Sequence, residues 1–245
     1  MVARTAAGKY FCRHLPVIFA KFPESARWSQ GAAPKDRCLD LGGERDLMHL
    51  VLALAVLAYL LGSIPSGLLV ARALGGPDPR RSGSGNLGTA NLYRLLGRKA
   101  GALTLLGDAA KGALPVALAR LTLTSLGAWQ EAGVALVAAA AVTGHVFPLY
   151  LGFKGGKAVA TTFGVVAVLA PWAALNLVAV YILALSQTRT FSISALICAW
   201  LLPVAVGLFS DSKAYLLLAG ALSGLVLVCH RENLERFFKG EEPRL

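Results

Sequence analysis

A turn near the middle of the chain combines the residue types that bind a small anion. In the segment GHVFPLYLGFKGGKAVAT, residues 144–161, Gly155 and Gly156 stand between Lys154 and Lys157. Glycines leave main-chain N–H groups accessible in a tight turn, and the ammonium groups of lysine attract negative charge. The pattern indicates a phosphate-binding turn. The alternative is a pair of lysines that marks the cytoplasmic side of a membrane protein.

This turn does not meet the requirements of a nucleoside triphosphatase. The Walker A motif has four residues between its first glycine and its final glycine–lysine pair, whereas three separate Gly152 from that pair here. Ala158 also replaces the hydroxyl residue that would bind magnesium. The turn, which opens onto a helix that carries Thr161 and Thr162, suits a monophosphate better than ATP.

A second glycine-rich loop follows the first apolar run. Residues 75–99 read GGPDPRRSGSGNLGTANLYRLLGRK, where Pro77 and Pro79 prevent a continuous helix. A helix that starts near Leu87 would add the positive end of its dipole to the N–H groups of the loop. A flexible linker is the alternative. The candidate anion-binding residues here are Gly83, Ser84, Gly85, Asn86, Asn91 and Arg94.

Three ionisable residues lie inside apolar segments, where a charge is costly and usually faces a cavity or a partner. Asp108 and Lys111 share a helix face and could neutralise each other, so we expect a structural role for the pair before a catalytic one. His145 precedes Pro148 in VTGHVFP and is either a structural hydrogen-bonding residue or an acid–base group.

The last polar cluster follows the final apolar run. Residues 229–242 read CHRENLERFFKGEE. Arg236 and Lys239 fit an amphipathic tail at the membrane surface. His230 and Asn233 are better candidates for a site, because membrane orientation does not need them.

The elements that position these residues must be membrane helices. The chain has 245 residues, of which 56% are hydrophobic and 15% charged, and its mean hydropathy is +0.62. Soluble domains have about a quarter of their residues charged. The net charge of +11 does not indicate a nucleic-acid surface, because the basic residues lie between hydrophobic runs rather than on one polar face. The cysteines have no metal-binding or redox spacing.

A helix needs about 20 apolar residues to cross a bilayer. We interpret the uncharged stretch 158–187 as two short helices that meet at Pro171–Trp172, because proline breaks a helical pattern. This gives an all-α polytopic membrane protein with seven transmembrane helices. The basic loops then share one side, so the positive-inside rule places the N-terminus outside and the C-terminus in the cytoplasm. The other candidate spans are 48–74, 100–126, 132–152, 192–210 and 214–230.

The first 47 residues differ from the rest of the chain. They mix charge, proline and glycine without sustained periodicity, and they contain no signal-peptide pattern. We hypothesise that Met48 is the natural initiator and that residues 1–47 are a mis-annotated or disordered extension. The membrane domain is then 48–245.

The ordered motifs of residues 48–245 resemble the bacterial acyl-phosphate-dependent glycerol-3-phosphate acyltransferases. The resemblance rests on LLGSIPSGLLVAR, GSGNLGTANLYRLLG, DAAKGALPV, GHVFPLYLGFKGGKAVAT and HRENLERFFKGEE. It implies a multi-pass enzyme of the bacterial plasma (inner) membrane with no metal or other cofactor. Such an enzyme transfers a fatty acyl group from a long-chain acyl phosphate to the 1-hydroxyl of glycerol 3-phosphate, and releases lysophosphatidic acid and inorganic phosphate. Its partners are these two substrates and membrane lipid, not nucleic acid.

The resemblance also implies roles for residues at matching positions. The catalytic and phosphate-binding residues would be Ser84, Arg94, Lys157, His230 and Asn233. The phosphate loops would contain Gly83, Gly85, Asn86, Gly155 and Gly156. Further substrate-binding positions would be Arg80, Asn91, Asp108, Lys111, His145 and Lys154.

Two departures from the family pattern affect the expected geometry. Ala158 stands where the family has a third glycine, so we expect a helix to begin here with an ordinary helical φ. Thr89 and Ala90 are exchanged relative to the family's order. The general base is either an oxygen of the donor's own phosphate or a histidine, His230 or His145.

Two other functions remain open from the residues alone. A secondary transporter of an anionic metabolite would place its site at the membrane midplane between repeats, and no inverted repeat is evident. A non-catalytic membrane scaffold would not need glycines and cations in two separate loops.

Overall fold

The computed structural model describes residues 41–244, and these form α-helices and two short 3-10 helices with no strand. The prediction about residues 1–47 falls mostly on residues 1–40, which lie outside the described part of the chain, and it stays a prediction. Helix α1 begins at Leu41, before Met48. The α-helices are α1 (Leu41–Gly62), α2 (Ser66–Ala73), α3 (Thr89–Thr122), α4 (Gln130–Val146), α5 (Val159–Leu169), α6 (Pro171–Thr188), α7 (Phe191–Phe209), α8 (Lys213–Cys229) and α9 (Arg231–Phe238). The 3-10 helices are η1 (Thr124–Trp129) and η2 (Leu149–Leu151).

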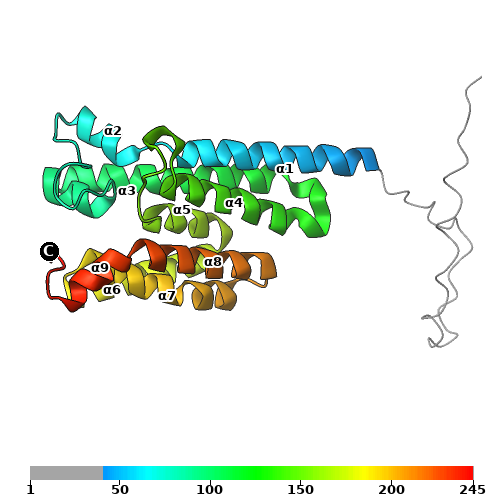
Figure 1. Cartoon of the computed structure of the whole chain (residues 1–245). Helices are drawn as coiled ribbons and strands as arrows, with labels where there is room; N and C mark the ends of the chain where they lie inside the picture. The colour runs from blue at the N-terminus through cyan, green and yellow to red at the C-terminus, as the bar shows by residue number, and fades with distance from the viewer. Residues whose placement is uncertain (1–40, 245) are drawn as a thin grey trace, which may run out of the picture. The chain divides into compact units, whose positions relative to one another are not determined.

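The long helices run side by side in two groups (Figure 1). Helices α1, α3 and α4 form one group, and α6, α7 and α8 form the other. The short helix α5 packs against α3 and leads into α6, so it lies between the groups. The predicted break at Pro171–Trp172 is confirmed, because α5 ends at Leu169 and α6 begins at Pro171.

Close helix packing depends on glycine. A Cβ atom on Gly112 of α3 would lie 2.3 Å from the carbonyl oxygen of Thr161 on α5. A Cβ atom on Gly164 of α5 would lie 2.0 Å from the carbonyl oxygen of Ala109 on α3. Small residues at the interface are typical of membrane helices, which gain stability from close backbone approach rather than from the hydrophobic effect.

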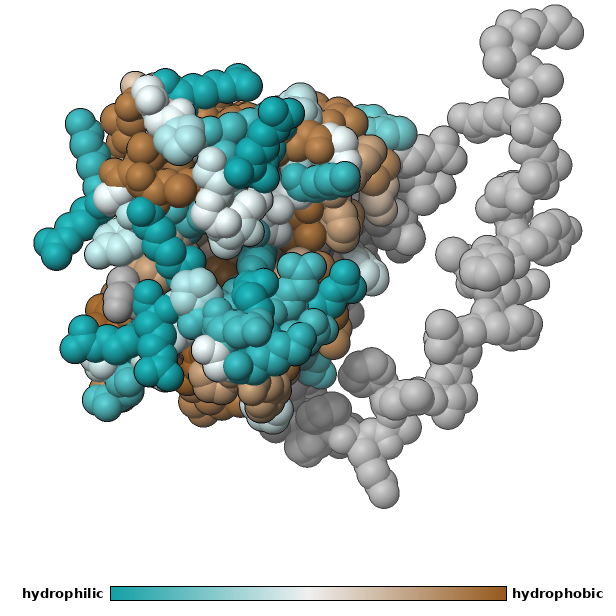
Figure 2. Space-filling model, turned by 60° about the vertical axis from the view of Figure 1, so that its left-hand side comes forward, coloured by the Kyte–Doolittle hydropathy of each residue, from teal (hydrophilic) through white to brown (hydrophobic). Residues whose placement is uncertain are grey.

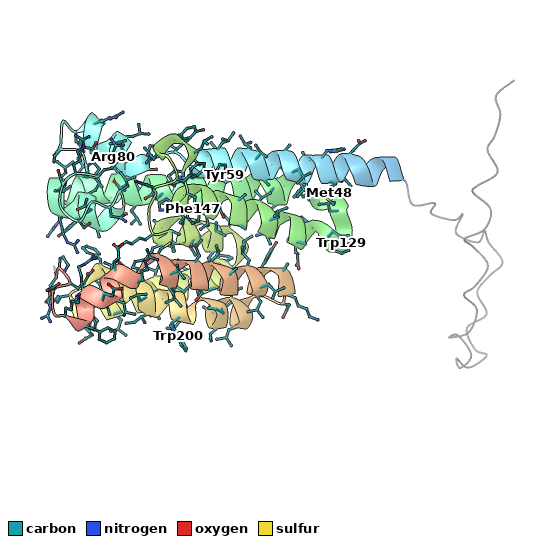
Figure 3. The ribbon with its side chains drawn as sticks, viewed as in Figure 1. Met48, Tyr59, Arg80, Trp129, Phe147 and Trp200 are labelled. Atoms are coloured by element: carbon teal, nitrogen blue, oxygen red, sulfur yellow. The ribbon has the colours of Figure 1, made fainter. Side chains whose placement is uncertain are left out.

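Five described helices or helix pairs are long and apolar enough to cross a membrane, and the number rises to six if α8 and α9, bent by 52°, count as one span. Helix α5, at 11 residues, is shorter than a usual span. The predicted all-α membrane fold is therefore confirmed, whereas the count of seven spans and the orientation stay predictions. The exposed surface suits lipid: Trp129 and Trp200, labelled in Figure 3, are each 74% exposed.

Two interruptions shape the helices near the predicted site. The predicted span 48–74 consists of α1 and α2, separated by Ser63, Ile64 and Pro65. Helix α3 begins at Thr89, close to the expected start at Leu87, and has a kink at Gly97, where φ is 80°.

Candidate anion-binding site

The predicted site segments gather toward one end of the helical bundle. The loop between α2 and α3, which carries Arg80, lies at the end opposite to Met48 and Trp129 (Figure 3). Helix α9 and the C-terminal tail lie at the same end as this loop (Figure 1). Figure 2 turns that end forward and shows hydrophilic residues over it, with hydrophobic residues along the sides.

The loop before α3 is organised by Asn91. The side-chain amide of Asn91 donates to the carbonyl oxygens of Pro79 and Ser82, both at 3.1 Å, and of Asn86 at 2.8 Å. Its Oδ1 accepts from the main-chain N–H of Ser84 at 2.9 Å. Asn91 is 1% exposed. Its polar groups are used within the protein, which favours a role in shaping the loop rather than in contacting substrate.

The predicted glycine turns of this loop do have the left-handed backbone that glycine allows. Gly83 has φ +62° and Gly85 has φ +70°. A Cβ atom on Gly83 would also lie 2.3 Å from Oδ1 of Asn91. The amide of Gly85 donates to the carbonyl of Ser82, so this amide and that of Ser84 are not free for an anion. The side chain of Ser84 is exposed.

Arg80 is held by its own loop. Its guanidinium binds both carboxylate oxygens of Asp78, with a shortest distance of 2.6 Å. This hydrogen bonding lowers the pKa of Asp78 to about 2 and raises the pKa of Arg80. Arg80 therefore lies at the predicted end of the bundle, but its positive charge is already paired with Asp78.

The Gly155–Gly156 turn does not present its amides as predicted. The N–H of Gly155 donates to the carbonyl oxygen of Val146, and that of Gly156 donates to the carbonyl oxygen of His145, both at 3.1 Å. The turn thus binds the C-terminal end of α4. The interpretation of these two N–H groups as a phosphate nest is wrong, because the helix end already uses them.

The expectation for Ala158 is also wrong. Its φ is +64° and its ψ is −2°, so it adopts the left-handed conformation and α5 begins one residue later, at Val159. This conformation costs a non-glycine residue about 1–2 kcal/mol. The methyl group of Ala158 is fully buried, which offsets part of that cost.

A hydrogen-bonded chain joins Lys157 to the C-terminal tail. The ammonium of Lys157 donates to Oδ1 of Asn233 on α9, and Nδ2 of Asn233 donates to Oε1 of Glu242 at 2.5 Å. The same oxygen of Glu242 accepts from Oγ of Ser192 at 2.6 Å, and Oε2 accepts from Nε of Arg236 at 2.9 Å. Two predicted residues thus meet in one cluster with three residues that the sequence reasoning did not propose for the site.

The electrostatics of this cluster follow from its composition. Burial lowers the pKa of Lys157, and the positive charge of Arg236 adds to the effect. Burial would raise the pKa of Glu242, but the hydrogen bonds from Ser192, Asn233 and Arg236 outweigh it and lower the pKa. Glu242 stays ionised at neutral pH and orders the groups around it.

Arg94 lies beside the same tail. Its Nη2 donates to the carbonyl oxygen of Pro243 at 3.3 Å. Its guanidinium carbon is 5.8 Å from the centre of the Phe191 ring, which Tyr93 contacts edge-on at 5.6 Å. Because Pro243 follows Glu242, Arg94 belongs to the cluster of Lys157 and Asn233.

His230 connects α8 to α9 and is 4% exposed. Its Nδ1 is 2.8 Å from the carbonyl oxygen of Val226. A carbonyl only accepts, so the proton of a neutral imidazole belongs on Nδ1, which leaves the lone pair on Nε2. His230 therefore has the tautomer that a general base needs, with Nε2 as the basic atom.

Asp108, Lys111 and His145 form a separate buried cluster. The ammonium of Lys111 is 2.9 Å from Oδ1 of Asp108 and donates to the carbonyl oxygen of Ile64 at 2.9 Å, in the interruption between α1 and α2. Nδ1 of His145 is 3.6 Å from Oδ1 of Asp108. The three residues line a small cavity of about 10 Å³ together with Gly155 and Gly156.

The remaining predicted residue, Lys154, is exposed on the turn, and its N–H donates to the carbonyl oxygen of Leu151. Within residues 41–244, no group of three or more His, Cys, Asp or Glu side chains is placed to hold a metal ion.

Two of the residues that the sequence reasoning missed could not be treated alike at the level of sequence. Glu242 lies in the polar motif at residues 229–242, and the basic residues of that motif could have suggested a buried carboxylate as their partner. Ser192 gave no signal, because it begins an apolar helix.

The comparisons of this chain with known proteins all indicate one family. Residues 52–240 match the family model described as glycerol-3-phosphate acyltransferase. A glycerol-3-phosphate acyltransferase from Syntrophotalea carbinolica is 44% identical over 188 residues, which are 76% of this chain and 93% of that protein.

Solved structures show the same similarity. One is PlsY (YgiH), an integral membrane glycerol 3-phosphate acyltransferase, in its glycerol 3-phosphate form, with a TM-score of 0.73 and 33% identity over 80% of this chain and 96% of that one. Its lysophosphatidic acid form gives a TM-score of 0.72, also at 33% identity, and covers 80% of this chain and 95% of that one.

Proposed function

Because the chain belongs to the glycerol-3-phosphate acyltransferase family of membrane enzymes, we propose that it transfers a fatty acyl group from acyl phosphate to the 1-hydroxyl of glycerol 3-phosphate. The products are lysophosphatidic acid and inorganic phosphate. This reaction would be the first membrane step of phospholipid synthesis. The glycerol 3-phosphate and lysophosphatidic acid forms of the structural relative support both the acceptor and the product.

The observation that carries the proposal is the cluster around Lys157 and Asn233. Arg94, Lys157 and Arg236 contribute three positive charges, and Glu242 contributes one negative charge, so the cluster has a net charge of +2. A phosphate monoester carries up to two negative charges. Its oxygens would accept hydrogen bonds from Lys157 and Arg94 and replace part of their present contacts.

The reaction needs no covalent intermediate on the protein. The 1-hydroxyl oxygen attacks the carbonyl carbon of the acyl phosphate, and the bond between that carbon and the bridging oxygen breaks. Inorganic phosphate leaves with the bonding electrons. The hydroxyl proton goes to a phosphate oxygen of the donor or to Nε2 of His230, whose Nδ1 is fixed by Val226. Holding the two substrates together supplies the largest part of the acceleration, up to about 7–11 kcal/mol in favourable cases.

The other predicted residues have different roles in this proposal. We assign Ser84, which is exposed on the loop that Asn91 organises, to binding the donor phosphate. Asn91 and the glycines of that loop hold its shape. Asp108, Lys111 and His145 lie outside the anion cluster and act on it indirectly.

The membrane arrangement supports a lipid substrate. We propose seven spans, with α5 as a short fourth span, the N-terminus outside and the C-terminus in the cytoplasm of a bacterial plasma membrane. The cation cluster then faces the cytoplasm, where glycerol 3-phosphate is dissolved. The acyl chain of the donor remains in the lipid beside the apolar helices, which expose residues such as Leu106 and Leu217.

A transporter of an anionic metabolite is the second candidate, and the family relationship argues against it. One assay separates the two functions. Purified protein in detergent is given palmitoyl phosphate with and without glycerol 3-phosphate. We expect phosphate release and lysophosphatidic acid only when both are present. Release that does not depend on the acceptor, or no release at all, would exclude the proposed reaction.

A further inference from the structure

The imidazole of His145 lies directly against the turn that carries Lys157. A Cβ atom on Gly156 would lie 2.2 Å from Nε2 of His145 and 2.7 Å from its Cε1. Real Cβ contacts are never this short, so no residue other than glycine fits at this position while the ring stays in place. Since the N–H of Gly156 is also bonded to the carbonyl oxygen of His145, the turn contacts both the side chain and the main chain of one residue.

The neighbouring glycine is constrained in a different way. A Cβ atom on Gly155 would lie 2.1 Å from the carbonyl oxygen of His145 and 2.5 Å from Cδ of Pro148. These obstacles are main chain and a proline ring, so shortening the side chain of His145 would not remove them. The two glycines thus offer a matched pair for experiment.

The ring of His145 is buried and packs against a charged pair. It is 7% exposed, and its Nδ1 faces Oδ1 of Asp108 at 3.6 Å. Asp108 is bonded to Lys111, which also binds the carbonyl oxygen of Ile64 in the α1–α2 interruption. The charged pair thereby fixes a point on α3 to a point at the end of α1, and the imidazole rests against it.

The chain after His145 is tied to α1 as well. The hydroxyl of Tyr59 donates to the carbonyl oxygen of Phe147 at 2.9 Å, and these two residues lie together in Figure 3. The N–H of Leu149 donates to Oγ of Ser63 at 3.3 Å. The segment between α4 and the Gly155–Gly156 turn therefore has little freedom, and the position of the turn depends on what it packs against.

We propose that His145 is a positioning residue whose imidazole sets the place of Gly156, and through it the place of the Lys157 ammonium opposite Asn233. On this account Gly156 is glycine because of His145, and not because a substrate phosphate approaches its main chain. The proposal rests on the proposed function, since Lys157 is taken to bind the phosphate of glycerol 3-phosphate. His145 is not the general base in this account.

The test is a double-mutant cycle in the full-length protein, with Gly156→Ala, His145→Ala and the two combined. The readouts are kcat and KM for glycerol 3-phosphate and the thermal unfolding temperature in detergent. We expect Gly156→Ala to raise KM about tenfold or more in the wild-type background, equivalent to about 1.4 kcal/mol. We expect less than about a threefold effect in the His145→Ala background, because the obstacle is gone. A merely structural role would lower the amount of folded enzyme without raising KM.

Gly155→Ala is the matched control, and its effect should be equally large in both backgrounds. If Gly156→Ala is as damaging with His145→Ala as without it, Gly156 is needed for another reason and the proposal is overturned. His145→Asn, which is too short to reach Gly156, replaces His145→Ala if the latter is poorly folded. If the wild type shows no acyl transfer, the proposed function fails, whereas the coupling between positions 145 and 156 can still be measured from thermal unfolding.

Discussion

The ammonium of Lys157 donates a hydrogen bond to the side-chain oxygen of Asn233, a residue 76 positions further along the chain. This contact joins the turn before α5 to helix α9. It makes the C-terminal tail part of the site, because Asn233 in turn donates to Glu242. The site therefore includes side chains from α9 and the C-terminal tail as well as from the glycine-rich loops.

Replacing Glu242 with glutamine should make stability less dependent on pH. The pKa of Glu242 is lowered from 4.5 in the folded protein, so its ionised form stabilises the fold fully above about pH 4.5. That contribution is lost as the pH falls through the folded-state pKa. The wild type should therefore lose thermal stability on acidification below this range, and Glu242→Gln should lose less, starting from a lower value at pH 7.

The adjacent Glu241, which is exposed, supplies the control. Glu241→Gln should follow the wild-type profile. Equal profiles for Glu242→Gln and the wild type between pH 7 and pH 4, measured by thermal unfolding in detergent, would show that the carboxylate is not stabilised as described.

Enzyme activity should fall even when Asn91 is replaced by a residue of the same shape. Asn91→Asp retains the oxygen that accepts from Ser84 but loses the donor to three carbonyl groups and places a charge in a buried position. We expect activity to fall at least about tenfold, since one buried polar group without a partner costs about 1–3 kcal/mol. The measurement is kcat/KM for the acyl phosphate. Asn86→Ala removes only the acceptor for Gly88 and should have a smaller effect. Equal activity of Asn91→Asp and wild type would contradict the loop-shaping role.

Asp108 and Lys111 should be less damaging to lose together than singly. Removing one partner leaves a buried charge and costs about 3–5 kcal/mol, whereas replacing both with neutral residues is often nearly neutral. Asp108→Asn and Lys111→Met should each lower the unfolding temperature more than the double variant does. An additive loss in the double variant would show that the two charges do not compensate each other.

The proposed orientation can be tested at the two ends of the segment formed by α8 and α9. In a cysteine-free background, Asp211→Cys before α8 and Lys239→Cys after α9 should differ in their reaction with a membrane-impermeant maleimide on intact cells. Both positions are exposed in the structure. We expect only the first to be labelled without permeabilisation. Labelling of the second position alone would show that the orientation is the opposite of the one proposed.

Several features of the fold could be predicted from sequence because they depend on local rules. Proline at 171 predicted the break between α5 and α6, and the glycines at 83 and 85 predicted left-handed turns. The apolar runs at 192–210 and 214–230 predicted α7 and α8 closely, whereas α3 begins at Thr89, well before the predicted span 100–126.

The errors came from features that arise only when the chain folds. Nothing in GFKGGK shows that the N–H groups of Gly155 and Gly156 are already bonded to the end of α4, because the partner carbonyls become adjacent only after folding. Ala158 was expected to avoid positive φ, but it adopts φ +64° immediately before α5, where its methyl group is buried. Ser192 was missed because its role depends on a tail that begins after α9.

The most direct test of the anion cluster is the steady-state kinetics of Lys157→Met against Lys239→Met. Lys239 is an exposed cation at the end of α9. It controls for charge at this face. Removing a charged hydrogen bond of about 2–3 kcal/mol should lower kcat/KM for glycerol 3-phosphate about 30- to 150-fold in Lys157→Met. Lys239→Met should stay within about threefold of wild type, since exposed charges contribute little. If both variants retain wild-type kcat/KM, Lys157 does not bind the acceptor and the account of the site is wrong.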